Sequence, residues 1–515
     1  MSQKKYWQSF GEISKHENLQ KKEDNEFREE LPFEDVKEGL MDAKSPRRDF
    51  LKYLGFSTAA AALAAGCKIP VRHVIPFANK PENIIPGEAS YYATTFVQDG
   101  EVIPVVAKVR DGRPIKIEGN TLATSYTKGG TSARSQASVL DLYDTNRITH
   151  PKRKVGDKYE ETTYEFIDKT IAESLAAAGG PVVLLTGTIV SPSTKQIISE
   201  FLAKYPNSRH VQADAVSYAG MLLANEVSGF GKNLPTYKFD LAKVIVSLGA
   251  DFLGGWMNPV ENATGYTKGR KIDEKDPQMS KHYQFEGNLS QTGGSADERF
   301  SHRPSETGAV ALAILAGLDG SVTAPALADT KLKAGIAKVV ADLKANNGAA
   351  LVISGSNDVN VQTVVNAINN AIGAYGKTID WAVTSNYRQG IDKDLVDLVS
   401  QMDSGQVGAI LIAGANPAYC FYDAEKFKAA LKKVKLSVAF SEKMDETTEL
   451  CSYIVPVHHY LESWGDAEPK SGFTCFMQPA INPLFKTRPF QASLLKWAGN
   501  NTDYDTFFRN YWTTK

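Results

Sequence analysis

The chain has 515 residues, of which 42% are apolar, and its 58 Lys and Arg residues nearly balance 59 Asp and Glu residues. This composition predicts a globular protein with a large core, and the absence of a basic surplus argues against nucleic acid as a partner. The four cysteines are Cys67, Cys420, Cys451 and Cys475. They lack the spacing of a haem or iron–sulfur motif, so neither group is expected in this chain.

Residues 1–44 form a charged N-terminal extension. Two interpretations of this segment remain open. Its charge is typical of a solvated arm, whereas the aromatic residues Tyr6, Trp7 and Phe10 offer apolar area suited to docking on a partner.

Residues 45–67 have the layout of a twin-arginine export signal. Arg47 and Arg48 precede an uncharged, alanine-rich stretch over residues 53–66, and small residues lead to Cys67 as in a lipoprotein processing box. An internal alanine-rich helix that ends at Gly66 is the alternative. The signal predicts a location on the periplasmic face of the bacterial inner membrane, with Cys67 as the site of a lipid anchor.

Residues 68–150 are predicted to form a β-rich lead domain. The runs "YYATTFV", "EVIPVVAKV" and "PIKIEG" are typical of strands, and the sequences "QDG" and "RDG" between them favour hairpin turns.

Residues 151–515 show the alternation of an α/β region. Helices are predicted over 332–345 and 361–373, between buried strands that end in glycine turns. This pattern predicts doubly wound, mostly parallel sheets, in which ligands bind at the carboxyl ends of the strands. The predicted strands with their turns are 181–187, 243–251, 349–358 and 408–417.

These turns and their flanking motifs resemble the molybdopterin oxidoreductase family over most of residues 89–500. The motifs are "LYDTNRITHP" (142–151), "SLGADFLGG" (247–255), "LSQTGGSADERFSHRPSET" (289–307), "LIAGANPAYC" (411–420) and "SEKMDETTELCSYIVPVHHYLESWGDAEPKSG" (441–472). A narrower resemblance is to the B subunits of alternative complex III, a bacterial membrane complex that oxidises quinol. It is carried by "KKYWQSF", the displaced export signal, "GCKIPVRHVIPFANKPENIIPG" and "YLESWGDAEPKSGF".

The resemblance implies a crevice for a pterin dinucleotide, which we expect to be vestigial here. Active family members hold an iron–sulfur cluster with four cysteines, but Ser132 stands at the position of the last one, and residues 68–419 contain no cysteine. Ser217 is the one candidate for the metal ligand, and we expect it to cap a helix or form a hydrogen bond instead. The crevice residues implied by the resemblance are Gly249, Ala250, Asp251, Gly414, Ala415 and Asn416.

The expected function is that of a structural subunit, without cofactors or a catalytic centre of its own, in a quinol-oxidising respiratory complex. The resemblance implies partners with iron–sulfur clusters, multihaem cytochromes and quinol-binding integral membrane subunits. B subunits normally continue into a ferredoxin-like region, so this chain is a split subunit or a fragment. Two alternatives remain open: an exported molybdopterin-dependent oxidoreductase with Ser217 on the metal, and a lipoprotein that binds a solute in the crevice.

Overall fold

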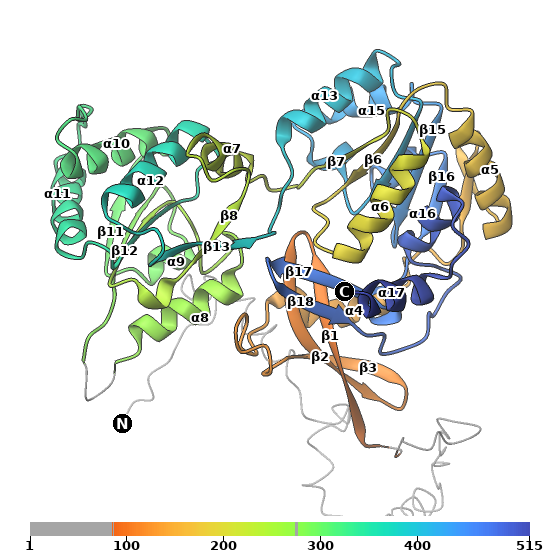
Figure 1. Cartoon of the computed structure of the whole chain (residues 1–515), viewed down its shortest axis with the longest axis horizontal. Coiled ribbons are helices and arrows are strands. Elements are labelled where there is room, and N and C mark those ends of the chain that lie inside the picture. Colours follow the sequence, from red (N-terminus) through yellow and green to blue (C-terminus); the bar gives the residue numbers. More distant parts are fainter. Residues whose placement is uncertain (1–84, 86, 273–276) are drawn as a thin grey trace, which may run out of the picture. The chain divides into compact units, whose positions relative to one another are not determined.

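The computed structural model describes residue 85 and residues 87–272 and 277–515 (Figure 1). All described residues belong to one compact unit, Asn79–Lys515. Within this described part, no helix has the length and apolar character needed to span a membrane. The predictions for the extension 1–44, Tyr6, Trp7, Phe10, Arg47, Arg48 and Cys67 concern residues outside the described ones.

A three-stranded antiparallel sheet begins the described part, with strands β1 (Ala89–Gln98), β2 (Glu101–Arg110) and β3 (Arg113–Gly119). Both turns are Asp-Gly pairs with positive φ at each residue: 49° and 80° at Asp99 and Gly100, and 49° and 75° at Asp111 and Gly112. Such turns match the twist of paired strands. The strands and turns predicted here are confirmed. Helix α4 (Ala133–Leu142) packs against β3.

The largest sheet has seven strands in the order β5-β4-β16-β15-β14-β6-β7. Five of them, from β16 to β7, are parallel, and the hairpin of β4 and β5 joins the edge in antiparallel fashion. The bounds are β4 (Lys152–Val155), β5 (Lys158–Glu161), β6 (Val182–Thr186), β7 (Arg209–Gln212), β14 (Ala409–Ala413), β15 (Leu436–Ser441) and β16 (Tyr453–Pro456).

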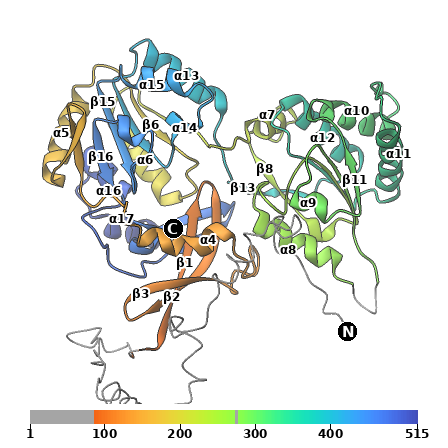
Figure 2. The same ribbon diagram turned by 180° about the vertical axis from the view of Figure 1, so that it is seen from behind.

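Helices cover both faces of the seven-stranded sheet. Successive side chains of a strand point to opposite sides, and since central strands such as β6 and β14 are apolar at successive positions, both faces are buried. On β6, Val182 and Leu184 pack with α5, α6, α16 and α17, whereas Val183 and Leu185 pack with α13 and α15. Figure 2 shows these helices around the sheet. This is the predicted doubly wound arrangement. The bounds are α5 (Tyr164–Ala176), α6 (Pro192–Lys204), α13 (Asp392–Asp403), α15 (Ala424–Leu431), α16 (Phe490–Ala498) and α17 (Tyr504–Thr513).

Between β7 and β14 the chain forms a second parallel sheet, in the order β11-β10-β9-β12. The four predicted buried strands are therefore divided between two sheets, with β6 and β14 in one and β9 and β12 in the other. Each is a run of five residues, of which at least four are buried, so the sequence pattern does not specify its partners. The strands are β9 (Val244–Leu248), β10 (Lys281–Glu286), β11 (Glu298–Ser301) and β12 (Ala350–Ser354).

Five helices longer than two turns accompany this second sheet, and the predicted helices 332–345 and 361–373 correspond to two of them. Their apolar residues share one hydrophobic core with the strands. The helices are α7 (Ala219–Val227), α8 (Pro259–Arg270), α10 (Thr307–Leu318), α11 (Thr330–Ala345) and α12 (Val359–Ala371).

An antiparallel sheet in the order β18-β17-β13-β8 joins distant parts of the sequence. The edge strand β18 of this sheet is also connected to β1 of the three-stranded sheet. The Thr95 hydroxyl on β1 donates a hydrogen bond to the Phe476 carbonyl on β18 at 2.9 Å. The lead sheet is thereby fastened to the C-terminal part of the chain. The strands are β8 (Leu234–Tyr237), β13 (Ile379–Ser385), β17 (Gly465–Lys470) and β18 (Phe473–Met477).

Candidate functional site

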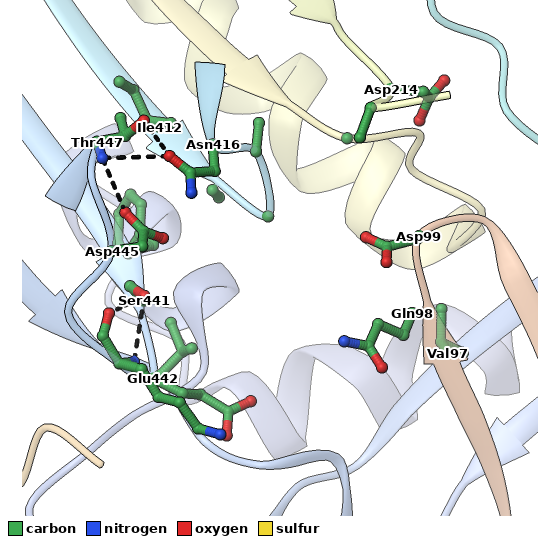
Figure 3. Close-up of a pocket in the computed structure, with 18 of the residues that line it drawn as sticks. Val97, Gln98, Asp99, Asp214, Ile412, Asn416, Ser441, Glu442, Asp445 and Thr447 are labelled. Carbon is green, nitrogen blue, oxygen red and sulfur yellow. Dashed lines mark hydrogen bonds between the residues drawn. The ribbon is translucent and has the colours of Figure 1, made fainter. Parts of the chain in front are cut away.

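A cavity of about 590 Å³ opens at the carboxyl ends of β6, β14 and β15, and we call it the strand-end cavity (Figure 3). The β1–β2 turn and α4 contribute to its wall. In Figure 3, Gln98 and Asp99 face Asn416, Asp445 and Glu442 across the cavity. This edge is where doubly wound sheets bind ligands. Its acidic, basic and histidine lining residues are Asp99, Asp141, Asp214, Arg388, Glu442, Lys443, Asp445 and His459.

Gly414, Ala415 and Asn416 line the strand-end cavity, as half of the predicted crevice. The Asn416 side chain is already bound within the chain: its Oδ1 accepts hydrogen bonds from the Thr447 N–H at 3.2 Å and hydroxyl at 2.7 Å, and its Nδ2 donates to Glu446 at 2.7 Å. Gly414 has a φ of 62°, which glycine adopts without strain. This turn therefore serves the packing of the chain itself.

Gly249, Ala250 and Asp251, the other predicted half, follow β9 in the second sheet and are not among the residues that line the strand-end cavity. Asp251 accepts hydrogen bonds from the Thr292 N–H at 3.0 Å and hydroxyl at 2.6 Å. A Cβ atom at Gly355 would lie 2.3 Å from the Gly249 carbonyl oxygen, so the two glycine turns pack backbone to backbone. Close packing accounts for Gly355, and a φ of 70° accounts for Gly249, without a ligand.

Ser132 caps a helix, whereas Ser217 lies one residue before the N-cap of α7 and forms hydrogen bonds there. Ser132 is the N-cap of α4: its hydroxyl accepts from the Ser135 N–H at 3.1 Å, and Ser135 Oγ accepts from the Ser132 N–H at 3.0 Å. The Ser217 hydroxyl donates to Asp392 at 2.7 Å and accepts from the Ala219 N–H at 3.0 Å, at the start of α7. Neither serine lines the strand-end cavity.

A buried ion pair lies behind the cavity wall. The guanidinium of Arg147 donates two hydrogen bonds to the Glu462 carboxylate, at 3.1 and 2.7 Å, and the two side chains are 1% and 0% exposed. Burial favours the neutral acid, but the hydrogen bonds from Arg147 and from the Leu484 and His459 N–H groups hold the pKa of Glu462 below its usual value. The pair joins two of the family-like motifs.

Glu442 occupies the cavity wall beside this pair. Its carboxylate lies 3.8 Å from Arg147 Nε and is 31% exposed. Burial raises its pKa to about 7, against the opposing effect of Arg147 and with a contribution from the Glu462 charge. Arg147 cannot fully neutralise the Glu442 charge, because its guanidinium already donates hydrogen bonds to both carboxylate oxygens of Glu462. The cavity therefore contains a carboxyl group that titrates near neutral pH.

We expect the stability of Glu442→Gln relative to wild type to be greater at pH 8 than at pH 5. Between the ordinary glutamate pKa of 4.5 and the native value of about 7, the native wild-type chain binds more protons than the unfolded chain. Wild-type stability at this site therefore falls as pH rises, by at most about 1.4 kcal/mol per pH unit, and the variant does not share this loss. Melting temperatures of both proteins at the two pH values test this. An equal difference at pH 5 and pH 8 would contradict it.

His458 and His459 adjoin the same pair and remain neutral. Burial lowers the pKa of each imidazole to about 4, and the nearby Arg147 acts in the same direction. His459 is 4% exposed and accepts a hydrogen bond at Nδ1 from the Leu461 N–H. Within the described residues, no three His, Cys, Asp or Glu side chains are grouped so as to hold a metal ion.

The fold is similar to that of a solved enzyme structure. Acetylene hydratase from Pelobacter acetylenicus matches with a TM-score of 0.59; it is 13% identical and the match covers 79% of this chain and 69% of the hydratase. The predicted molybdopterin oxidoreductase-like α/β fold is thus confirmed.

The chain is also similar in sequence to a subunit of a quinone reductase. The menaquinone reductase, molybdopterin-binding-like subunit of Nitratidesulfovibrio vulgaris is 25% identical in an alignment 512 positions long, which covers 88% of this chain and 72% of that subunit. No family model matches the sequence. The predicted resemblance to a molybdopterin oxidoreductase-like subunit is confirmed by this similarity.

The lining of the strand-end cavity does not fit the pterin dinucleotide that this fold implies. A diphosphate needs basic side chains or free N–H donors, whereas the acidic and basic lining residues comprise five carboxyl groups and two basic groups. Of the two, Lys443 already binds Asp141 at 2.9 Å and Asp144 at 2.8 Å. The donor set therefore favours a cation over a diphosphate.

Proposed function

We propose that the chain is a structural subunit, without a redox cofactor of its own, of a membrane-bound respiratory complex of the alternative complex III type, which passes electrons from quinol to a periplasmic acceptor. In this proposal the subunit organises its neighbours and performs no chemistry itself. The partners are subunits that carry iron–sulfur clusters, multihaem cytochromes and quinol-binding integral membrane subunits.

The similarity to the menaquinone reductase subunit supports a role in quinone metabolism. That relative is named for the reduction of a quinone, whereas the proposed complex oxidises a quinol. A chain without cofactors fits both directions, because the redox centres of its partners determine where electrons flow. The choice of alternative complex III rests on the motifs "KKYWQSF" and "YLESWGDAEPKSGF".

The proposal that the chain lacks a cofactor rests on one observation: Ser132, at the position of a cluster ligand, caps a helix. A cluster ligand must be a thiolate, because hard hydroxyl oxygens do not retain iron and sulfide. Ser132 carries a hydroxyl, which caps α4, and residues 68–419 supply no cysteine in its place. Without a cluster, an electron on a pterin would have no exit through this chain.

The proposed location is the periplasmic face of the inner membrane. It rests on Arg47 and Arg48, which have the layout of a twin-arginine signal, and on Cys67 as a site for a lipid anchor.

Purification from detergent-solubilised membranes tests the proposed function. We expect the affinity-tagged chain to elute in one large assembly with haem-containing and iron–sulfur subunits, identified by mass spectrometry and by haem absorbance. The physical reason is that a subunit without redox chemistry acts through its neighbours. Recovery as a stable monomer in the soluble periplasmic fraction would refute the assignment.

A further inference from the structure

Two carboxylates in the strand-end cavity, Asp214 and Asp445, have no basic partner among the described residues. Asp214 accepts hydrogen bonds from neutral donors, the Thr188 N–H and hydroxyl at 3.0 and 2.7 Å and the Gly390 N–H at 2.9 Å. Asp445 accepts from two backbone N–H groups, at 3.1 and 2.7 Å. Neutral donors fix these side chains in place but leave their charge in the cavity.

The two basic residues that line the cavity, Lys443 and Arg388, interact with groups other than Asp214 and Asp445. Lys443 lies between Asp141 and Asp144, within 2.9 Å of each carboxylate. Arg388 donates through Nε to the Asp99 carbonyl at 3.0 Å, and its guanidinium lies 5.1 Å from the centre of the Tyr387 ring. Neither cation is placed to neutralise Asp214 and Asp445, so the cavity as a whole is acidic.

Exposed tyrosines stand beside this acidic cavity. Tyr419, in the short helix α14 (Pro417–Cys420), lines the cavity and is 74% exposed, and Tyr422 shortly after it is 78% exposed. Aromatic faces attract cations, and tyrosine is enriched in protein interfaces. The cavity rim thus combines features that favour contact with a basic polypeptide.

We propose that the strand-end cavity receives a lysine or arginine side chain from a basic segment of a partner subunit, with Tyr419 packed at the entrance. This proposal rests on the proposed membership of a multi-subunit complex. Charge complementarity selects a cation and disfavours a diphosphate. A macromolecular partner fits better than a metal ion, because the cavity measures about 590 Å³ and its rim offers exposed aromatic area.

Carboxyl footprinting of the intact complex tests the proposal. The assembled complex and the isolated chain are treated with a carbodiimide and glycine ethyl ester, and labelled peptides are quantified by mass spectrometry. We expect labelling of Asp214 and Asp445 to fall at least about fivefold on assembly, because an ion-paired side chain excludes the reagent. Glu173, exposed on α5, serves as the internal control and should not change. Equal labelling of Asp214 and Asp445 in both samples would overturn the proposal.

A neutralising variant provides a second readout. Both backbone N–H groups at Asp445 donate to its Oδ1, which an asparagine retains, so Asp445→Asn should fold. We expect the NaCl concentration that releases half of this variant from the immobilised complex to fall about threefold, while Glu173→Gln behaves as wild type. An unchanged release profile would count against the basic partner.

The two proposals fail in different ways. If no complex contains the chain, the proposed function fails, and the partner segment fails with it. If the complex is isolated but Asp214 and Asp445 remain fully reactive in it, the proposed function stands and the cavity proposal alone is wrong. Release of a small organic cation or a pterin on denaturation of a protected complex would also overturn the partner segment in favour of a bound solute.

Discussion

Replacing Arg147 with methionine is expected to lower the free energy of unfolding by about 3–5 kcal/mol, because it leaves the Glu462 carboxylate buried without a counter-charge. Glu462 is 0% exposed on its side chain, and Arg147 supplies two of its hydrogen bonds. The loss also removes the Arg147 contact with the Leu142 carbonyl and with the Phe485 ring. Urea denaturation followed by tryptophan fluorescence measures the effect.

The matched control for Arg147→Met is the double variant Arg147→Met/Glu462→Leu. Removal of both charges leaves no unpaired ion, and a buried pair replaced by apolar groups of similar volume is often tolerated. We expect the double variant to regain most of the lost stability. A single variant within about 1 kcal/mol of wild type would show that the pair contributes little.

Trp497→Ala is expected to cost about 3–5 kcal/mol, the usual range for truncating a large buried aromatic side chain. Trp497 is fully buried on α16, its ring centre lies 5.6 Å from that of Phe440 on β15, and its indole N–H donates to Asp168 at 3.0 Å. The substitution would leave a cavity between α16 and the seven-stranded sheet.

Trp497→Phe separates packing from hydrogen bonding. This control keeps an aromatic ring in the core but loses the donor to Asp168, so we expect a smaller cost of about 1–2 kcal/mol. Differential scanning calorimetry of the three proteins gives the order wild type, Trp497→Phe, Trp497→Ala. Equal melting temperatures for all three would show that α16 is not an integral part of this core.

The sequence predicted the local elements well, because local patterns determine them. The buried runs that became β6, β9, β12 and β14 have the length and apolar character of core strands, and the Asp99-Gly100 turn has the residues that positive φ requires. Sheet membership was not predictable, because pairing depends on contacts between distant segments. The insertion of a second sheet between β7 and β14 leaves no periodic signature in the chain.

The candidate site was predictable only in part. The turn Gly414–Asn416 lies at a strand end, as its glycine indicated, and it lines the cavity. The Arg147–Glu462 pair was missed, since its members are 315 residues apart. Both lie in motifs that carried the family resemblance, which was the one available signal. The titration of Glu442 near neutral pH depends on burial beside that pair, which a single sequence does not reveal.

The proposed absence of a redox cofactor from this chain is tested by elemental analysis. The chain is separated from its partners under mild conditions, and molybdenum, tungsten and iron are measured by mass spectrometry against protein concentration. We expect no stoichiometric metal. A content of about one molybdenum or tungsten, or about four irons, per chain would contradict this expectation and favour a molybdopterin-dependent oxidoreductase.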